Sequence, residues 1–152
     1  MNPTLLCDTR EKNPIVIPDN RVFADVIRKK LDTGDYSIDG FEQYLCIERK
    51  GCVAEFAQNV FQKRFYNELL RMTTYKYPFL LLEFTLEDML RFPYQSGLSK
   101  SVVRRIKYNG KLLLKKMIEI QMSYPTIHII FCGENINDVL YSICKRVVEI
   151  HA

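Results

Sequence analysis

The chain has 152 residues and a net charge of +4, with 47% hydrophobic and 26% charged residues, which is ordinary for a single globular domain with a buried core. No apolar run approaches the roughly 20 residues that span a bilayer, and the first residues lack the basic and then apolar pattern of a signal peptide. We therefore expect an intracellular protein, in the cytoplasm or nucleoid or in a eukaryotic nucleus, with no membrane partner.

The cysteines also favour a reducing compartment. Their number is odd, and none are spaced as a C-x-x-C pair: Cys7, Cys46, Cys52, Cys132 and Cys144. We interpret them as reduced core residues rather than as disulfides or a zinc site.

The charge is distributed unevenly along the chain. Residues 91–116 contain eight Lys or Arg and no Asp or Glu, so the other residues hold 14 basic and 18 acidic side chains. One basic segment on an otherwise slightly acidic body predicts a surface that faces a polyanion.

The first predicted strand is Thr4–Cys7, and it delivers Asp8 at its carboxyl end. Taken alone, the segment Asp8-Thr9-Arg10-Glu11 is more typical of a solvated turn than of a site. The downstream motifs described below decide in favour of a site residue.

The next residues are less clear. Two prolines within residues 13–20 predict a loop. Residues 21–31 fit either a helix capped by Asp19 or Asn20, or a strand over about 25–31 that runs into a Gly-Asp pair. The pattern alone does not decide between them.

A hairpin is predicted next, because the β-like runs Asp35–Ile38 and Tyr44–Arg49 flank a turn that includes Asp39-Gly40. The hairpin brings Asp35 and Glu48 toward one point. Two convergent carboxylates in a dry cleft need a cation to stay charged, and their hard oxygen atoms suit Mg²⁺ or Mn²⁺.

Lys50 follows Glu48 by two residues, so it points to the same face of the strand. It could then reach a metal-bound water or a phosphate oxygen. A metal, an attacking water and a cation for the developing charge are the minimum equipment for metal-assisted hydrolysis of a phosphodiester.

The rest of the chain alternates between strands and helices. The pattern predicts a helix over 53–74, a buried strand over Tyr77–Phe84, a short helix over 85–90 capped by Thr85, a loop over 91–101, a helix over 102–123 that Asn109-Gly110 could kink or split, a buried strand over Thr126–Cys132, and an amphipathic helix over Asn135–His151. These elements predict an α/β domain, and the last helix could either cover the sheet or form a dimer contact.

Four cations within the predicted helix 102–123 recur at spacings of 3, 4 and 4 residues and would share one face: Arg104, Lys107, Lys111 and Lys115. Like charges without acidic neighbours repel, and DNA phosphates would relieve that repulsion. A solvated helix face is the alternative. We predict that these four residues, with Lys100 in the preceding loop, bind DNA.

Three motifs occur in order along the first half of the chain: Asp8-Thr9-Arg10-Glu11, Gly34-Asp35-Tyr36 and Ile47-Glu48-Arg49-Lys50. Together they resemble the D-x-R-E, GD and ERK signature of the nuclease domain of XPF-type structure-specific endonucleases. The resemblance covers roughly residues 4–84. It implies a restriction-endonuclease-like core with a central mixed sheet flanked by helices, a divalent metal and a DNA substrate. It also favours the strand over about 25–31.

The resemblance implies roles for particular residues. It implies that Mg²⁺ or Mn²⁺ is held by Asp8, Asp35 and Glu48, with help from the backbone carbonyl of Arg49. Lys50 would orient or activate the attacking water, and Arg10 and Arg49 would neutralise the scissile phosphate and hold the carboxylates. Arg64 would contact phosphate, and Glu11 and Glu55 would lie beside the site.

One departure leaves catalysis open. The family signature continues as ERK-x-x-x-D, but Ala54 occupies that acidic position and Glu55 comes one residue later. One residue on a helix rotates a side chain by about 100°. The alternatives to a nuclease are therefore a catalytically silent DNA-binding module that acts with a partner protein, and a structural α/β domain in which the motifs are coincidental.

The family's tandem helix-hairpin-helix module has no counterpart in these residues, so a preference for flaps or forks stays open. The resemblance implies a homodimer or a complex with a partner protein, and a role in DNA repair or recombination.

Overall fold

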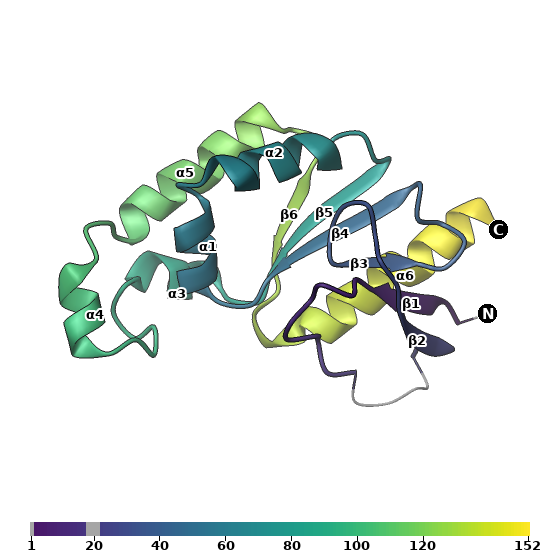
Figure 1. The fold of residues 1–152 in the computed structure, drawn as a ribbon, viewed down its shortest axis with the longest axis horizontal. Coiled ribbons are helices and arrows are strands. Elements are labelled where there is room, and N and C mark those ends of the chain that lie inside the picture. Colours follow the sequence, from purple (N-terminus) through teal and green to yellow (C-terminus); the bar gives the residue numbers. More distant parts are fainter. Residues whose placement is uncertain (1, 18–21) are drawn as a thin grey trace.

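A computed structural model of the protein describes residues 2–17 and 22–152. Its centre is a six-stranded sheet in the order β2-β1-β3-β4-β5-β6, with helices on both faces (Figure 1). The strands are β1 (Thr4–Cys7), β2 (Asp25–Arg28), β3 (Tyr36–Ile38), β4 (Leu45–Lys50), β5 (Tyr77–Leu82) and β6 (His128–Phe131). The predicted α/β class with a central mixed sheet is confirmed.

The helices are α1 (Val53–Asn59), α2 (Lys63–Met72), α3 (Leu86–Arg91), α4 (Lys100–Arg105), α5 (Gly110–Ser123) and α6 (Ile136–His151), with a 3-10 turn η1 (Gly133–Asn135) before α6. Thr85 caps α3 through a reciprocal capping box with Asp88, as the sequence predicts. Over the described ranges, none of these helices has the length and apolar character to cross a membrane.

The sheet is mixed because its two halves are connected differently. β1 is parallel to β2 and antiparallel to β3, and β3 is antiparallel to β4. β4, β5 and β6 run parallel, with helices in the crossovers between them. The predicted hairpin is confirmed as β3 and β4, and Gly40 supplies the positive φ of +85° that its turn requires.

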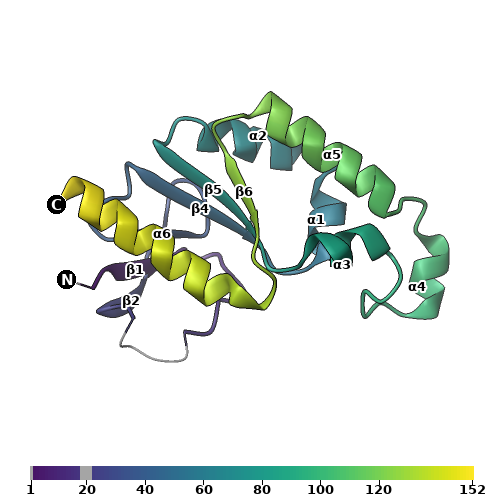
Figure 2. The ribbon, with the colours of Figure 1, turned by 180° about the vertical axis from the view of Figure 1, so that it is seen from behind.

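Strand alternation divides the core between two faces of the sheet. Leu45 and Ile47 of β4 belong to one hydrophobic cluster with α6, whereas Cys46 between them belongs to a second cluster with α1, α2 and α5. Figure 2 shows α6 lying across one face of the sheet. The face under α2 is the one that carries the candidate site.

The strand alternative for residues 25–31 is confirmed in shortened form as β2. All four residues of β2 are exposed, because β2 is an edge strand that pairs only with the four-residue β1. Asp19 and Asn20, considered as helix caps, lie outside the described residues.

The predicted helix over 53–74 is wrong as a single element, because residues 60–62 separate α1 from α2. This turn contains neither glycine nor proline, so the sequence carries no signal for it. The break lets α1 follow directly from the end of β4 while α2 lies over the sheet (Figure 1).

The predicted helix over 102–123 is split at Asn109-Gly110, one of the two outcomes that the sequence allowed. The Asn109 side chain caps α5 by accepting a hydrogen bond from the Leu112 amide at 3.2 Å. The prediction that four cations share one helix face is therefore wrong. Arg104 lies on α4, Lys107 lies between α4 and α5, and only Lys111 and Lys115 lie on α5.

The last strand is also less buried than predicted. β6 is the second edge strand, and His128 at its start is exposed and packs against the Phe79 ring at 5.0 Å between centroids. All five cysteines are free and all except Cys52 are buried, which agrees with the predicted reduced core thiols.

Candidate active site

The register of the sheet aligns three carboxylate residues on neighbouring strands. Cys7 is opposite Tyr36, and Tyr36 is opposite Ile47. In an antiparallel ladder this pairing sets Asp8 beside Asp35 and Asp35 beside Glu48 one step further along. The backbone continues the ladder there, since the Asp8 amide donates to the Asp35 carbonyl at 2.7 Å and the Asp35 amide donates to the Ile47 carbonyl at 2.7 Å.

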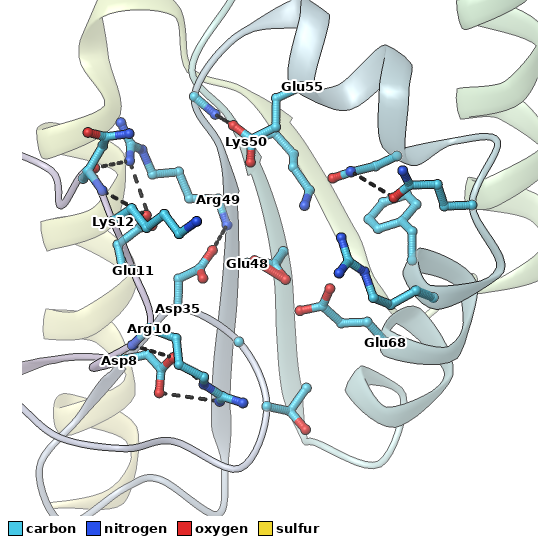
Figure 3. A pocket seen from close by; sticks show the side chains of 18 of the residues that line it. Asp8, Arg10, Glu11, Lys12, Asp35, Glu48, Arg49, Lys50, Glu55 and Glu68 are labelled. Atoms are coloured by element: carbon cyan, nitrogen blue, oxygen red, sulfur yellow. Dashed lines mark hydrogen bonds and ion pairs between the residues drawn. The ribbon is translucent and has the colours of Figure 1, made fainter.

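The same alternation decides which way these side chains point. Cys7, Tyr36 and Ile47 belong to the cluster under α6. Asp8 and Glu48 each come one residue after Cys7 and Ile47, and Asp35 comes one residue before Tyr36. Because neighbouring side chains on a strand point to opposite faces, all three carboxylates face the other side of the sheet, under α2. Figure 3 shows Asp35 and Glu48 pointing into a pocket on that side.

Gly34 permits the close approach of β3 and β4 at this point. Its φ is +86°, and a Cβ atom there would lie 2.8 Å from the Cys46 sulfur and 3.0 Å from the Ile47 carbonyl oxygen. The backbone therefore approaches β4 closely beside Asp35, and a larger residue at position 34 would push the two carboxylate-bearing strands apart.

Asp8 is buried at 2% exposure, and both of its oxygens are engaged. One accepts from the Arg10 backbone amide at 3.1 Å and from its Nε at 2.8 Å. The other accepts from the Leu31 amide at 2.8 Å and from the Arg10 guanidinium at 3.3 Å. Burial opposes ionisation, but these hydrogen bonds outweigh it and lower the pKa of Asp8. A metal could bind Asp8 only if one of these donors withdrew.

Asp35 is less fully engaged. One oxygen accepts from the Arg49 amide at 2.8 Å. Burial raises the pKa of Asp35, and the Asp8 charge adds to this, against the opposing effects of the Arg49 hydrogen bond and the Lys50 charge. Burial therefore makes the charged form of Asp35 costly, and a cation bound beside it would offset that cost.

Glu48 and Lys50 lie side by side on β4, and both are nearly buried, at 4% and 6% exposure. Within the described ranges, the Glu48 carboxylate accepts no hydrogen bond and forms no ion pair. The Lys50 ammonium lies 5.0 Å from the centre of the Phe65 ring. Burial lowers the pKa of Lys50, whereas the charges of Glu55 and Asp35 oppose that effect.

Arg49 points to the other side of β4 and acts as a clamp. Its Nε donates to Glu83 at 3.0 Å, and its guanidinium also bonds to the Asn13 carbonyl and lies 3.7 Å from Glu11. The guanidinium is therefore already occupied, while the Arg49 amide fixes Asp35. This geometry supports the predicted part of its role in holding carboxylates.

The opposite wall of the pocket is formed by α2 and contains a carboxylate that the sequence analysis missed. Glu68 points across the pocket toward Asp35 and Glu48 (Figure 3). Burial first, and the Asp35 charge second, raise the pKa of Glu68 to about 7. Arg64 and Arg71 line the same wall. The spacing of 4 and 3 residues among these three side chains places them on one helix face and was the available signal.

A sequence model described as the ERCC4 domain matches residues 7–145. The chain belongs to the ERCC4 domain family.

Two solved structures are similar to this ERCC4 domain. XPF from Aeropyrum pernix superimposes with a TM-score of 0.67 at 20% identity, covering 96% of this chain and 65% of that one. XPF from Aeropyrum pernix in complex with DNA gives a TM-score of 0.66 at 20% identity, covering 97% and 66%. This chain thus spans just under two thirds of those chains, and it has the restriction-endonuclease-like fold of the XPF nuclease domain. A search among curated proteins finds no match.

The departure from the ERK-x-x-x-D pattern has a structural explanation. α1 begins at Val53, so Ala54 packs against the hydrophobic core and Glu55 lines the pocket. The Glu55 carboxylate accepts a hydrogen bond from the Gly51 amide at 3.1 Å and faces the charge of Lys50. In this ERCC4 domain, the carboxylate at the edge of the pocket therefore comes from position 55, where Glu55 lies, and not from position 54.

The pocket as a whole is an open cleft of about 790 Å³. Its lining includes all eight of the predicted catalytic and adjoining residues: Asp8, Arg10, Glu11, Asp35, Glu48, Arg49, Lys50 and Glu55. Among the predicted DNA-binding residues only Arg64 lines it. Lys100, Arg104, Lys107, Lys111 and Lys115 lie outside the cleft, on α4, α5 and their connection.

The donor chemistry of the cleft fits a hard divalent cation. Among the described residues, the Glu48 carboxylate and one Asp35 oxygen have no hydrogen-bond partner, and all of these potential ligands are oxygen atoms, which suits Mg²⁺ or Mn²⁺. In the described part of the chain, no three Asp, Glu, His or Cys side chains are grouped closely enough to hold a metal ion. Binding would therefore require side chains to reorient, with Asp35 and Glu48 as the candidate ligands.

Proposed function

We propose that this ERCC4-domain protein is a divalent-metal-dependent DNA endonuclease. The observation that carries the proposal is the joint position of Asp35, Glu48 and Lys50 on one face of adjacent strands at the floor of a cleft. The similar structure of XPF from Aeropyrum pernix in complex with DNA supports DNA as the ligand.

The residues of the cleft divide the work by position. Asp35 and Glu48 would hold Mg²⁺ or Mn²⁺, which supplies a polarised water and stabilises charge on the phosphate. Lys50, which is buried beside Phe65, can orient that water or donate to a phosphate oxygen, and burial lowers the pKa of its ammonium group.

Arginine side chains that line the cleft would position the DNA backbone. Arg64 and Arg71 on α2 face the carboxylates and can bind the flanking phosphates. Arg10, with 61% of its side chain exposed, can turn from Asp8 to a phosphate. That exchange would remove one hydrogen bond from each Asp8 oxygen and leave the backbone amides of Arg10 and Leu31 in place, so the predicted metal role of Asp8 depends on substrate binding.

A second candidate function is a catalytically silent DNA-binding module that acts with a partner protein. Two observations favour it, namely the complete engagement of the Asp8 oxygens and the core position of Ala54 at the family's acidic site. In this case the cleft would bind a phosphate backbone without hydrolysing it.

The test is cleavage of end-labelled linear duplex, flap and fork DNA in Mg²⁺, Mn²⁺ or EDTA. We expect metal-dependent cutting that leaves 5′-phosphate and 3′-hydroxyl ends. We expect Glu48→Ala to reduce the cleavage rate by about 100-fold or more. The variant would lose a ligand of the metal ion that stabilises negative charge in the transition state. Glu87→Ala is the matched control, since Glu87 is 68% exposed on α3 and remote from the cleft lining.

The results separate the two candidates. Cutting that Glu48→Ala does not reduce would place the chemistry elsewhere. Binding without cutting by the wild type would favour the silent module. Size-exclusion chromatography with light scattering would test the proposed homodimer, and a monomer would favour action with a partner protein.

A further inference from the structure

An exposed aromatic residue lies on the turn between α1 and α2, directly beside the cleft. Phe61 is 47% exposed in this three-residue turn. It lines a second hollow of about 430 Å³ between α2 and α5. Gln62 lines both this hollow and the cleft, so the two adjoin at the α1–α2 turn. A polymer that left the cleft on this side would meet Phe61 next.

The Phe61 ring is held in place from beneath. Its centroid lies 4.9 Å from that of Tyr108, and the Tyr108 ring stacks on Phe92 at 5.9 Å with an interplanar angle of 12°. The three rings form a continuous aromatic support built from the α1–α2 turn, the α4–α5 connection and the end of α3. A ring that is already supported loses little freedom when a flat ligand stacks on it.

The charge around this ring is predominantly positive. Lys116 lies 5.8 Å from the centre of the Phe61 ring, and Lys63 lines the same hollow. The acidic residue in the lining of the hollow, Glu119, is 3.6 Å from the Lys116 ammonium, so these two charges compensate each other and Lys63 gives the hollow its net positive charge. An aromatic ring among lysines matches a nucleobase attached to a phosphate backbone, because the ring contacts the base and the cations contact the phosphates.

From these observations we propose that Phe61 is a stacking site for an unpaired base of the DNA strand that leaves the cleft. Bases within a duplex are stacked on one another, so only a single-stranded base is free to stack on a side chain. The inference rests on the proposed function and adds to it a residue outside the cleft that would contact a base of the DNA.

The experiment measures binding in EDTA, so that cleavage does not interfere. The probes are a blunt hairpin duplex and the same duplex with a 3′ or a 5′ single-stranded tail. Each tail carries 2-aminopurine at its first unpaired positions. Stacking on Phe61 should quench the 2-aminopurine fluorescence of one tail. Phe61→Leu keeps an apolar contact with Tyr108 but removes the aromatic face, and Phe61→Trp keeps an aromatic face.

We expect Phe61→Leu to weaken binding of the quenched tailed DNA by about 5-fold or more, the lower end of the effect of losing one stacked base, and to abolish the quenching. Phe61→Trp should retain both. Leu70→Ala is the control, because Leu70 is 62% exposed on α2 outside both hollows and should behave as the wild type. Thermal unfolding of each variant checks that the fold is intact.

The outcomes distinguish this inference from the proposed function. If the wild type binds DNA but Phe61→Leu binds and quenches the tailed DNA equally well, the stacking site is refuted and the nuclease proposal stands. If the wild type binds neither duplex nor tailed DNA, both proposals fall.

Discussion

Replacing Glu68 with glutamine removes one negative charge from the cleft and leaves the shape of the side chain nearly unchanged. Burial, with the Asp35 charge as a second cause, raises the pKa of Glu68 from 4.5 to about 7 in the folded protein. The folded state therefore holds the Glu68 proton more tightly than the unfolded chain does. The contribution of Glu68 to stability is therefore fully present below about pH 4.5 and is lost as the pH rises from there through about 7.

The size of this contribution to stability follows from the difference between the pKa of Glu68 in the unfolded chain and its pKa in the folded protein. An interval from 4.5 to about 7 corresponds to an upper limit of about 3 kcal/mol. Solvent reaches part of this carboxylate, so we expect about 1–2 kcal/mol after screening. Glutamine carries no such pH dependence.

Urea denaturation in EDTA at pH 5 and at pH 8 measures this effect. The wild type should lose about 1–2 kcal/mol more free energy of unfolding between these values than Glu68→Gln does. The exposed Glu87→Gln serves as the control and should parallel the wild type. If the wild type and Glu68→Gln lose the same free energy over this range, Glu68 does not face the buried charge of Asp35 as described, and the reasoning fails.

Two glycine substitutions test the packing that shapes the site. Gly34→Ala should lower the free energy of unfolding by about 3 kcal/mol in urea denaturation, because it combines a positive φ with crowding against Cys46 and Ile47, and it should also slow any cleavage. Gly110→Ala should lower it by at least about 2 kcal/mol, although alanine is the better helix former by about 1 kcal/mol, because the added methyl would overlap the Leu90 carbonyl. A Gly110→Ala protein as stable as the wild type would refute the close α3–α5 packing.

Part of the site could be predicted from local sequence. The Asp-Gly turn identifies the hairpin, and the two-residue alternation of a strand places Glu48 and Lys50 on one face. The positive φ of Gly34 beside Asp35 is a local requirement of the chain too. Hydrophobic patterning likewise identified the α/β class and most strands. Apolar residues that face the core recur along the sequence at the residue period of the strand or helix that carries them.

Other features depended on contacts between distant segments. Asp8 is saturated by Arg10 and by Leu31, which is 23 residues away. Arg49 lines the cleft, but its guanidinium is bound by Glu83, which is 34 residues away. The breaks after α1 and before α5 arise from docking on the sheet and on α3, and the sequence signalled only the second.

Glu68 illustrates the difference best. From sequence alone it is one charged residue on an amphipathic helix, where a solvated face is the ordinary outcome. The crossover from β4 to β5 lays α2 over the carboxylate-bearing strand ends and turns that face toward Asp35. The chain determined the chemistry at the strand ends because strand and turn geometry is local. Only the tertiary structure decided which helix wall opposes them, because that depends on how the crossover packs against the whole sheet.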